Sequence, residues 1–358
     1  MGSPKRPNSG GSIYTLAQSG TQHLPNPAES PEVMVYGQGS ALDQPEAWQN
    51  RARRKMITQS MILALIDIAK EKGDLERVQP YWNTYHCLNN VITSNGQVYS
   101  KYCKNRFCTS CCSIRKAEII NKYLPIIQTW EEPCFVTLTV KAQKASNLKK
   151  WMGGMKKAFN QILNRCKKRH QRGKGIKLVG IKSLECNFNP QKRTYNPHYH
   201  LIVANREIAN LLVVEWQKQW NQGEKKLTSP FAQDVRKIDN LEGALIEIIK
   251  YGSKIFTEPD VLKKANKKIP PTIYAAALDN IFVAMKPYRL FDRFGFNLPK
   301  ADKQKKVDPQ FLQFYEEWEF DKHQNDWLNP DTGELLSGHV AAPRLKFLLS
   351  EHINLSVQ

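Results

Sequence analysis

Two histidines stand two residues apart at the start of an apolar run, His198-Tyr199-His200 followed by residues 201–203. Side chains alternate along a β-strand, so His198 and His200 would point to one face and Tyr199 to the other. Imidazoles are common metal ligands, and a rigid strand would hold these two as half of a metal site. Taken alone, the pair is more often a pair of hydrogen-bonded core histidines, so the case for chemistry depends on other residues.

A second group of reactive side chains lies about fifty residues later, near the end of an expected helix over 241–250. Glu247 and Tyr251 are four residues apart and Tyr251 and Lys254 are three apart, so the three would share one helical face. A solvated polar face is the alternative for this group alone. Together with the histidines it would supply a metal, a nucleophile and a phosphate-binding cation. The apolar residues would face the core: Leu245, Ile248 and Ile249.

A carboxylate precedes the histidine strand. Residues 177–188 and 198–204 are expected to form a hairpin around the turn-prone segment 189–197. Antiparallel pairing would bring Glu185 near the two histidines. A surface glutamate is the alternative, but a charge within an apolar strand needs a partner. Two imidazoles and one carboxylate suit Mn²⁺ or Mg²⁺.

These residues carry a family resemblance. His198-Tyr199-His200 resembles the His-hydrophobic-His motif of the HUH endonucleases, and the segment 247–254 resembles their tyrosine motif. The apolar, threonine-containing segment 134–140 matches their remaining motif. The Glu-x-x-x-Tyr spacing is most similar to plasmid rolling-circle replication initiators (Rep proteins) of the single-tyrosine class. The resemblance covers roughly residues 85–256.

The resemblance implies an α+β fold with a mostly antiparallel, ferredoxin- or RRM-like sheet of about five strands, flanked by helices, with the histidine strand central. It implies nicking of single-stranded origin DNA by metal-assisted transesterification, followed later by religation or termination. Tyr251 would become joined to the 5′ phosphate and leave a 3′ hydroxyl primer. Glu185 occupies the position of the third metal ligand. Glu247 would act as general base in a terminating cleavage, and Lys254 would support the phosphate or the metal site.

Other functions stay open at this point. An HUH transposase of the two-tyrosine type would need a second tyrosine near Tyr251, where Glu247 stands instead, and a relaxase is a related alternative. A non-catalytic, zinc-containing DNA-binding regulator and an RNA-binding protein are alternatives of other classes. A second nucleophile, Tyr195 or Tyr274, has no motif behind it.

The charge of the chain indicates a polyanionic partner. The formal net charge is +20, from 53 basic and 33 acidic residues. Residues 141–177 contain thirteen Lys or Arg and no Asp or Glu, over an expected amphipathic helix at 146–170. A solvated surface is the alternative, but the one-signed charge favours contacts with phosphates of single-stranded and duplex origin DNA. The candidate DNA-binding residues are Lys149, Lys150, Lys156, Lys157, Arg165, Lys167, Lys168 and Arg169.

Five of the eight cysteines are close in sequence, in the pattern Cys103-x4-Cys108-x2-Cys111 with Cys112 adjoining and Cys87 sixteen residues before Cys103. This pattern predicts a structural Zn²⁺ site of four thiolates that folds a small, loop-rich module. Cys112 could replace Cys111, and His86 could replace Cys87. The expected ligands are Cys87, Cys103, Cys108 and Cys111.

The organisation expected from these patterns has five parts. They are a disordered polar arm at 1–44, a helical segment at 45–84, a zinc module at 85–118, the endonuclease core at 119–256 and an extension at 257–358 whose role the sequence leaves open. The extension could dock on the core, mediate oligomers or recognise the origin.

No stretch approaches the roughly 20 apolar residues of a membrane helix, and the N-terminus lacks the apolar region of a signal peptide. We therefore expect a cytoplasmic protein without a membrane partner, and the resemblance to plasmid Rep proteins implies a bacterial cytoplasm. Because the chain lacks a Gly-rich phosphate-binding loop, a host helicase and polymerase are expected partners. The sequence leaves oligomerisation open.

Overall fold

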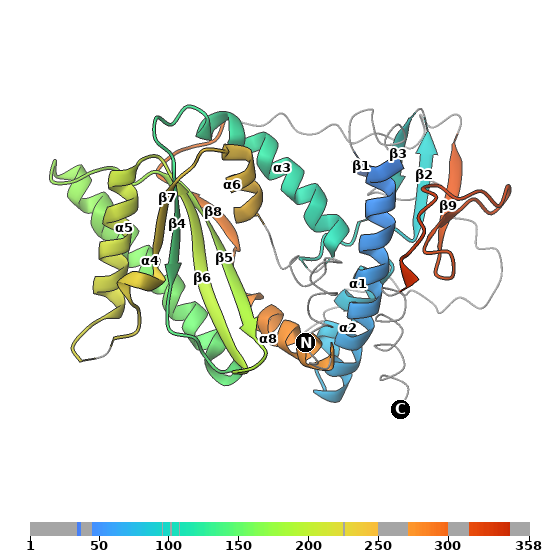
Figure 1. Cartoon of the computed structure of the whole chain (residues 1–358), viewed down its shortest axis with the longest axis horizontal. Helices are drawn as coiled ribbons and strands as arrows, with labels where there is room; N and C mark the ends of the chain where they lie inside the picture. Colours follow the sequence, from blue (N-terminus) through green and yellow to red (C-terminus); the bar gives the residue numbers. More distant parts are fainter. Residues whose placement is uncertain are drawn as a thin grey trace, which may run out of the picture.

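A computed structural model describes residues 34–36, 45–94, 96–100, 102–106, 108–224, 226–249, 271–299 and 315–343. Figure 1 shows two separate β-sheets with helices packed on and between them. Both sheets have only antiparallel pairings, in the orders β7-β4-β6-β5-β8 and β1-β3-β2-β9-β10. The predicted α+β class, with a five-stranded antiparallel sheet and flanking helices, is confirmed.

The histidine strand is the central strand of the first sheet, as predicted. It begins at Thr194, however, and not at His198, because the turn is confined to residues 190–193. Pro197 is tolerated there, since it lies beyond the last pair of the β4 ladder, Thr139 with His198. The strands are β4 (Cys134–Thr139), β5 (Gly180–Asn189), β6 (Thr194–Val203), β7 (Asp234–Lys237) and β8 (Phe291–Phe294).

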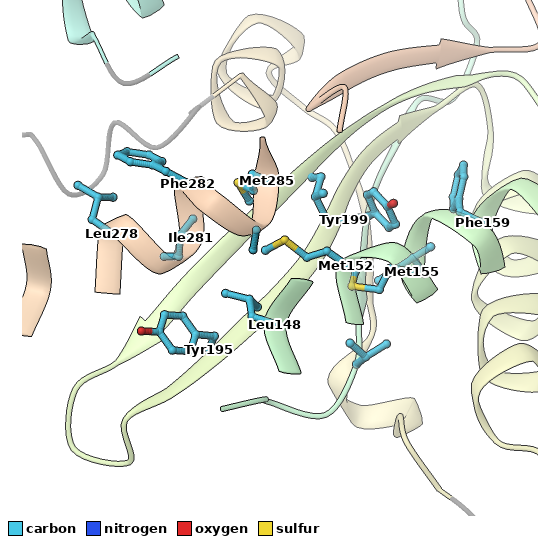
Figure 2. Packing of buried hydrophobic residues seen from close by; sticks show 14 of the residues in the cluster. Leu148, Met152, Met155, Phe159, Tyr195, Tyr199, Leu278, Ile281, Phe282 and Met285 are labelled. Atoms are coloured by element: carbon cyan, nitrogen blue, oxygen red, sulfur yellow. The ribbon is translucent and has the colours of Figure 1, made fainter. Parts of the chain in front are cut away.

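One face of this sheet is covered by α4 (Ala145–Gln171), which lies close to its expected bounds, and by α5 (Arg206–Trp220). The rings of Phe159 on α4 and Trp216 on α5 lie 5.3 and 5.9 Å from the ring of Tyr199 on β6. Figure 2 shows the apolar side of α4 against Tyr199 and Tyr195, with α8 alongside. Tyr199 thus points into the core, which leaves its neighbours His198 and His200 on the other face.

On the other face of the sheet, the described residues form an apolar cluster at one end. Phe135, Ile181 and Ile202 pack there with residues of α3 (Thr109–Ile127) and α6 (Leu241–Ile248). Asn240 caps α6, because its side chain accepts a hydrogen bond from the Gly243 N–H. The expected inward side of α6 is confirmed, since Leu245, Ile248 and Ile249 are all buried.

The part of the chain after residue 256 contributes to both sheets. Helix α8 (Pro271–Met285) packs on α4 and α1, and β8 pairs with β5 at the edge of the histidine sheet. Strands β9 (Glu316–Asp321) and β10 (Asp326–Leu328) belong to the second sheet. Among the described residues no helix is long and apolar enough to span a membrane.

The second sheet packs around tryptophans. Its other strands are β1 (Met34–Tyr36), β2 (Asn90–Ser94) and β3 (Gln97–Ser100), and β1 is the described part of the predicted polar arm. Trp327 on β10 is fully buried, stacks edge-on against Trp48 of α1 (Pro45–Glu71) and donates its indole N–H to the Leu88 carbonyl at 2.7 Å. The same core includes three of the cysteines predicted to bind zinc.

A buried carboxylate joins α8 to α1 and α2 (Leu75–Tyr85). Asp279 of α8 is 0% exposed and accepts hydrogen bonds from Lys72 at 2.8 Å and from the Tyr81 hydroxyl at 3.2 Å, and it also pairs with Arg77. A buried charge is stable only when it is paired. This cluster therefore fixes the N-terminal helices against the helix that packs on α4.

Asp279→Ala should lower the free energy of unfolding by about 3 kcal/mol, because the mostly buried Arg77 would keep only the more exposed Asp74 as its ionic partner and Tyr81 would lose its acceptor. Chemical denaturation followed by circular dichroism measures this change. Glu132→Ala is the control, since it removes only an exposed ion pair with Arg206 at 3.8 Å and should cost less than about 1 kcal/mol. Equal losses in the two variants would contradict the structural role of Asp279.

Candidate metal centre and cysteine site

Strand register brings the predicted metal ligands together. Glu185 on β5 is directly opposite His198 on β6, and His198 is in turn opposite Thr139 on β4. His200 follows on the same face, opposite Thr137. Side chains opposite one another in an antiparallel ladder share a face of the sheet. The three groups therefore stand on the same sheet face as Phe135 and Ile202, which pack with residues of α3 and α6.

The three side chains converge on one point. The Nε2 atoms of His198 and His200 are 3.1 Å apart, and a Glu185 carboxylate oxygen lies 3.8 and 3.7 Å from them respectively. The side chains of His198 and Glu185 are 4% and 8% exposed, and that of His200 is 12% exposed. His200 is thus the member of this metal triad, defined as Glu185, His198 and His200, that solvent reaches most easily.

The Nδ1 atoms of both histidine rings already have hydrogen-bond partners. His198 donates from Nδ1 to the Asn196 carbonyl at 2.9 Å, which leaves the Nε2 of the neutral ring as an electron-pair donor. His200 Nδ1 lies 3.2 Å from the Thr137 hydroxyl. Three electron-rich atoms therefore face one another in a mostly buried place, where a shared cation or proton stabilises them. The donor set fits a divalent metal ion with its rings held by outer hydrogen bonds.

Thr137 and the Asn196 carbonyl were not among the residues singled out in the sequence. The available signal was the alternation in Thr137-Leu138-Thr139, which puts both hydroxyls on the histidine face of the sheet. Their roles depend on register, which the sequence pattern leaves undetermined. The hydroxyl of Thr137 thus belongs to the outer shell of the metal triad.

Glu247 lies on the same side of the sheet, at the end of α6. It forms an ion pair with Arg236 of β7 at 2.7 Å, and the Arg236 guanidinium stacks on the Phe135 ring at 4.4 Å. The Phe135 ring in turn lies 5.1 Å from that of His200. These contacts connect Glu247 to the metal triad. Tyr251 and Lys254, the other expected catalytic residues, lie outside the described residues.

The two alternative tyrosines are buried. Tyr195 is 4% exposed and points to the α4 face, and its hydroxyl accepts a hydrogen bond from Asn280 at 2.9 Å. Burial raises the pKa of Tyr195 and also that of Tyr274, which is 8% exposed. A raised pKa disfavours the phenolate form that would act as a nucleophile.

The basic helix α4 lies on the sheet face opposite the metal triad. Two of its predicted DNA-binding residues have intramolecular partners, because Arg165 and Arg169 bind the mostly buried Glu215 of α5 at 3.0 and 3.2 Å. Burial raises the pKa of Glu215, but these two hydrogen bonds outweigh it and bring that pKa below its usual value. The remaining predicted side chains are exposed: Lys149, Lys150, Lys156, Lys157, Lys167 and Lys168.

Four cysteines meet in a second site, and they are the four named from the sequence: Cys87, Cys103, Cys108 and Cys111. Their sulfurs all lie within 4.8 Å of one another. The Cys111 sulfur is 3.7 Å from those of Cys87 and Cys103. Hydrogen bonding with Cys108 lowers the pKa of Cys103, and hydrogen bonding with Cys103 raises the pKa of Cys87 and Cys111. The set fits a tetrahedral thiolate site, in which Zn²⁺ would displace the remaining protons.

Backbone amides support this arrangement. The N–H groups of Cys103, Asn105 and Cys111 point at cysteine sulfurs at 3.4 to 3.5 Å. Lys55 of α1 donates to the Cys87 carbonyl at 2.7 Å, and burial lowers the pKa of this lysine to about 7. The sequence pattern did not indicate Lys55, because it is over thirty residues from the nearest cysteine.

The two alternative ligands lie outside the cluster. Cys112 points its thiol at the Arg106 carbonyl at 3.1 Å, and burial raises its pKa to about 12. His86 stacks on Trp82 and contacts Asn89 through Nδ1. Neither residue belongs to the group of four sulfurs.

A central strand with paired histidines, a carboxylate on the neighbouring strand and a threonine-bearing strand on the other side are consistent with the HUH core fold. A family model described as a replication protein matches residues 96–317. This match spans more than half of the chain, which therefore belongs to that family of replication proteins. The class predicted from the sequence motifs, a Rep protein, is confirmed.

Individual relatives agree with this family. The chain is 25% identical to a protein rep of Streptococcus pneumoniae, over 63% of this chain and 73% of that protein. It is 29% identical to a protein rep of Staphylococcus aureus, over 42% of this chain and 69% of the relative. A protein rep of a Bacillus species is 26% identical over 41% of this chain and 50% of its own length. No solved structure is significantly similar to the chain.

Thr137→Val should weaken Mn²⁺ binding about 10- to 100-fold, because loss of the hydroxyl frees the ring of His200 to rotate. Titration followed by electron paramagnetic resonance measures the affinity without any need for DNA. Thr129→Val is the control, since its exposed hydroxyl bonds only the Ile126 carbonyl at 2.7 Å. Unchanged Mn²⁺ affinity in Thr137→Val would remove this residue from the outer shell.

Cys111→Ala should lose bound zinc, whereas the adjacent variant Cys112→Ala should retain about one zinc ion per chain. Metal content of the purified proteins, measured by mass spectrometry, distinguishes the two. The pair is closely matched, because both thiols are buried at the start of α3. The reverse pattern would assign the ligand to Cys112.

Proposed function

We propose that this protein initiates plasmid rolling-circle replication by nicking one strand of origin DNA. The observation that carries the proposal is the metal triad, Glu185, His198 and His200, in a chain of the replication protein family. The proposed enzyme is a site-specific single-strand DNA endonuclease and strand transferase. The same reaction run in reverse would rejoin the strand.

A divalent cation at the metal triad, Mn²⁺ or Mg²⁺, would supply Lewis-acid polarisation of a non-bridging oxygen of the scissile phosphate. Glu185 and the Nε2 atoms of His198 and His200 would hold that cation. The structural zinc ion proposed at the four cysteines has a separate role, the folding of the second sheet's module.

Tyr251 is the proposed nucleophile. Its phenol oxygen forms a bond to phosphorus while the bond from phosphorus to the 3′ oxygen breaks. The phenol gives up its proton and the departing 3′ oxygen takes one up, so the products are a 5′-phosphotyrosyl adduct and a 3′ hydroxyl. The energy of the phosphodiester is kept in the adduct, and the hydroxyl can prime synthesis.

Glu247 is the proposed general base of the terminating cleavage, where it would take a proton from a water or a hydroxyl. Its ion pair with Arg236 is partly exposed, at 34% for the Glu247 side chain, so it can open when DNA binds. Lys254 would support the phosphate charge.

The exposed lysines of α4 would bind a different stretch of DNA from the one that is cut. They lie on the sheet face opposite the metal triad, so one phosphate cannot contact both. We assign them to duplex origin DNA and the face of the metal triad to the single strand. Action in the bacterial cytoplasm, together with a host helicase and polymerase, completes the proposal.

Tyr251→Phe should abolish the covalent adduct. The measurement uses labelled single-stranded origin oligonucleotides with Mn²⁺, followed by a denaturing protein gel. Wild-type protein should carry label to its band, and the variant and a sample treated with EDTA should not, because one lacks the nucleophile and the other the cation. DNA binding by Tyr251→Phe should stay near the wild-type level.

Tyr195→Phe and Tyr274→Phe are the matched controls, and both should retain the adduct because these phenols are buried. If the adduct survives in Tyr251→Phe but disappears in one of the controls, the tyrosine replaced in that control is the nucleophile. Absence of any adduct from wild-type protein, with metal-independent binding intact, would favour a non-catalytic DNA-binding protein.

A further inference from the structure

Phe231 stands in the 3₁₀ turn Pro230–Ala232 between α5 and β7, and its side chain is 100% exposed. A single exposed apolar residue needs no explanation by itself. The position of Phe231 is unusual, however, because its turn is hydrogen-bonded to β4, the strand that pairs with the histidine strand β6.

The turn is held by hydrogen bonds to Thr139, the last residue of β4. The Thr139 hydroxyl donates to the Ala232 carbonyl at 2.8 Å, and the Thr139 N–H donates to the side-chain carbonyl of Gln233 at 2.8 Å. The Thr228 hydroxyl donates to the Thr139 carbonyl at 2.8 Å. Backbone and side chain of one residue thus bind three residues of the loop.

Further bonds fix the loop itself. The Gln233 amide donates to the Thr228 hydroxyl at 2.7 Å and to the Ser229 carbonyl at 2.9 Å. Asn221 accepts from the N–H groups of Leu227 and Thr228. The backbone that carries Phe231 is therefore already ordered, so a ligand that packs on the ring loses little free energy to ordering of the loop.

Thr139 also sets the distance to the metal triad. It is directly opposite His198, and opposite residues of a ladder have Cβ atoms about 5 Å apart on a common face. The Ala232 carbonyl touches the Thr139 side chain, so the turn adjoins the face that carries the metal triad. A DNA strand bound at the metal triad would therefore have the Phe231 turn as a neighbour on the same side of the sheet.

We propose that Phe231 is a stacking platform for an unpaired base of the DNA strand held at the metal triad, an inference that rests on the proposed nuclease function. The charges around the turn are mixed: Lys141 and Lys226 are exposed beside it, and so is Asp234. Attraction of phosphate therefore does not single out this loop. Stacking does, because any unpaired base can lay its flat face on an exposed aromatic ring, whereas a base within a duplex is already stacked on its neighbours.

The test uses full-length, zinc-loaded protein with EDTA-free Ca²⁺ buffer and single-stranded origin oligonucleotides that carry 5-iododeoxyuridine at successive positions. Irradiation should cross-link one position to Phe231, located by mass spectrometry of the peptides. Phe231→Ala should lose this cross-link and bind single strands about 5- to 150-fold more weakly. Phe231→Trp should keep near wild-type affinity, because an indole stacks as well.

Val340→Ala is the control, because Val340 is another exposed apolar side chain, at 87%. It should bind single strands like wild type, and all variants should bind duplex DNA equally. Single-strand affinity unchanged by Phe231→Ala, or an equal loss on single-stranded and duplex DNA, would overturn the proposal. So would a change in sedimentation without a change in DNA affinity, which would make Phe231 a protein contact.

The binding measurements are independent of cleavage, so the two proposals can fail separately. Loss of single-strand affinity in Phe231→Ala supports the platform even where wild-type protein forms no Tyr251 adduct. An adduct formed normally by a Phe231→Ala protein of unchanged affinity leaves the nuclease function intact and rejects the platform.

Discussion

The register of β5 against β6 is the constraint on which the candidate active site depends. Because strand side chains alternate, a slip of one residue would turn both histidines under α4 and bring Tyr199 to the face that carries the metal triad. The register is fixed at both ends of the hairpin. At the turn, Asn189 accepts from two following N–H groups and Arg193 adopts φ 48°. At the far end, Gly180 leaves no room for a side chain, since a Cβ would lie 2.6 Å from the Phe294 ring.

Local patterns predicted the parts of the structure that depend on neighbouring residues. The spacing of His198 and His200 is enough to give a shared strand face, and an adjacent apolar strand is enough to suggest Glu185 as a partner. The cysteine spacing likewise gave the four sulfurs that meet. In each case a short segment contains the whole pattern, so few alternative arrangements compete.

The sequence pattern did not predict which strands distant in sequence pair with one another. Strand β8 completes the histidine sheet from a position almost ninety residues after the end of β6, and its four residues carry no signal of their own. The partner of Thr137 required the register, and the face covered by α4 required the tertiary packing of Phe159 on Tyr199. The sequence showed that the helix α4 is basic, but it did not show that α4 packs on the sheet face opposite the metal triad.

The second sheet is assembled from segments that lie on both sides of the nuclease core in sequence, because β2 pairs with β3 on one side and with β9 on the other. During synthesis, β2 leaves the ribosome about 220 residues before β9. At typical elongation rates the delay is about 10–45 s. Throughout that interval β2 is an open edge, the kind of strand that pairs with other chains. Newly made protein is therefore most prone to misassembly before its last eighth, which begins with β9, is translated.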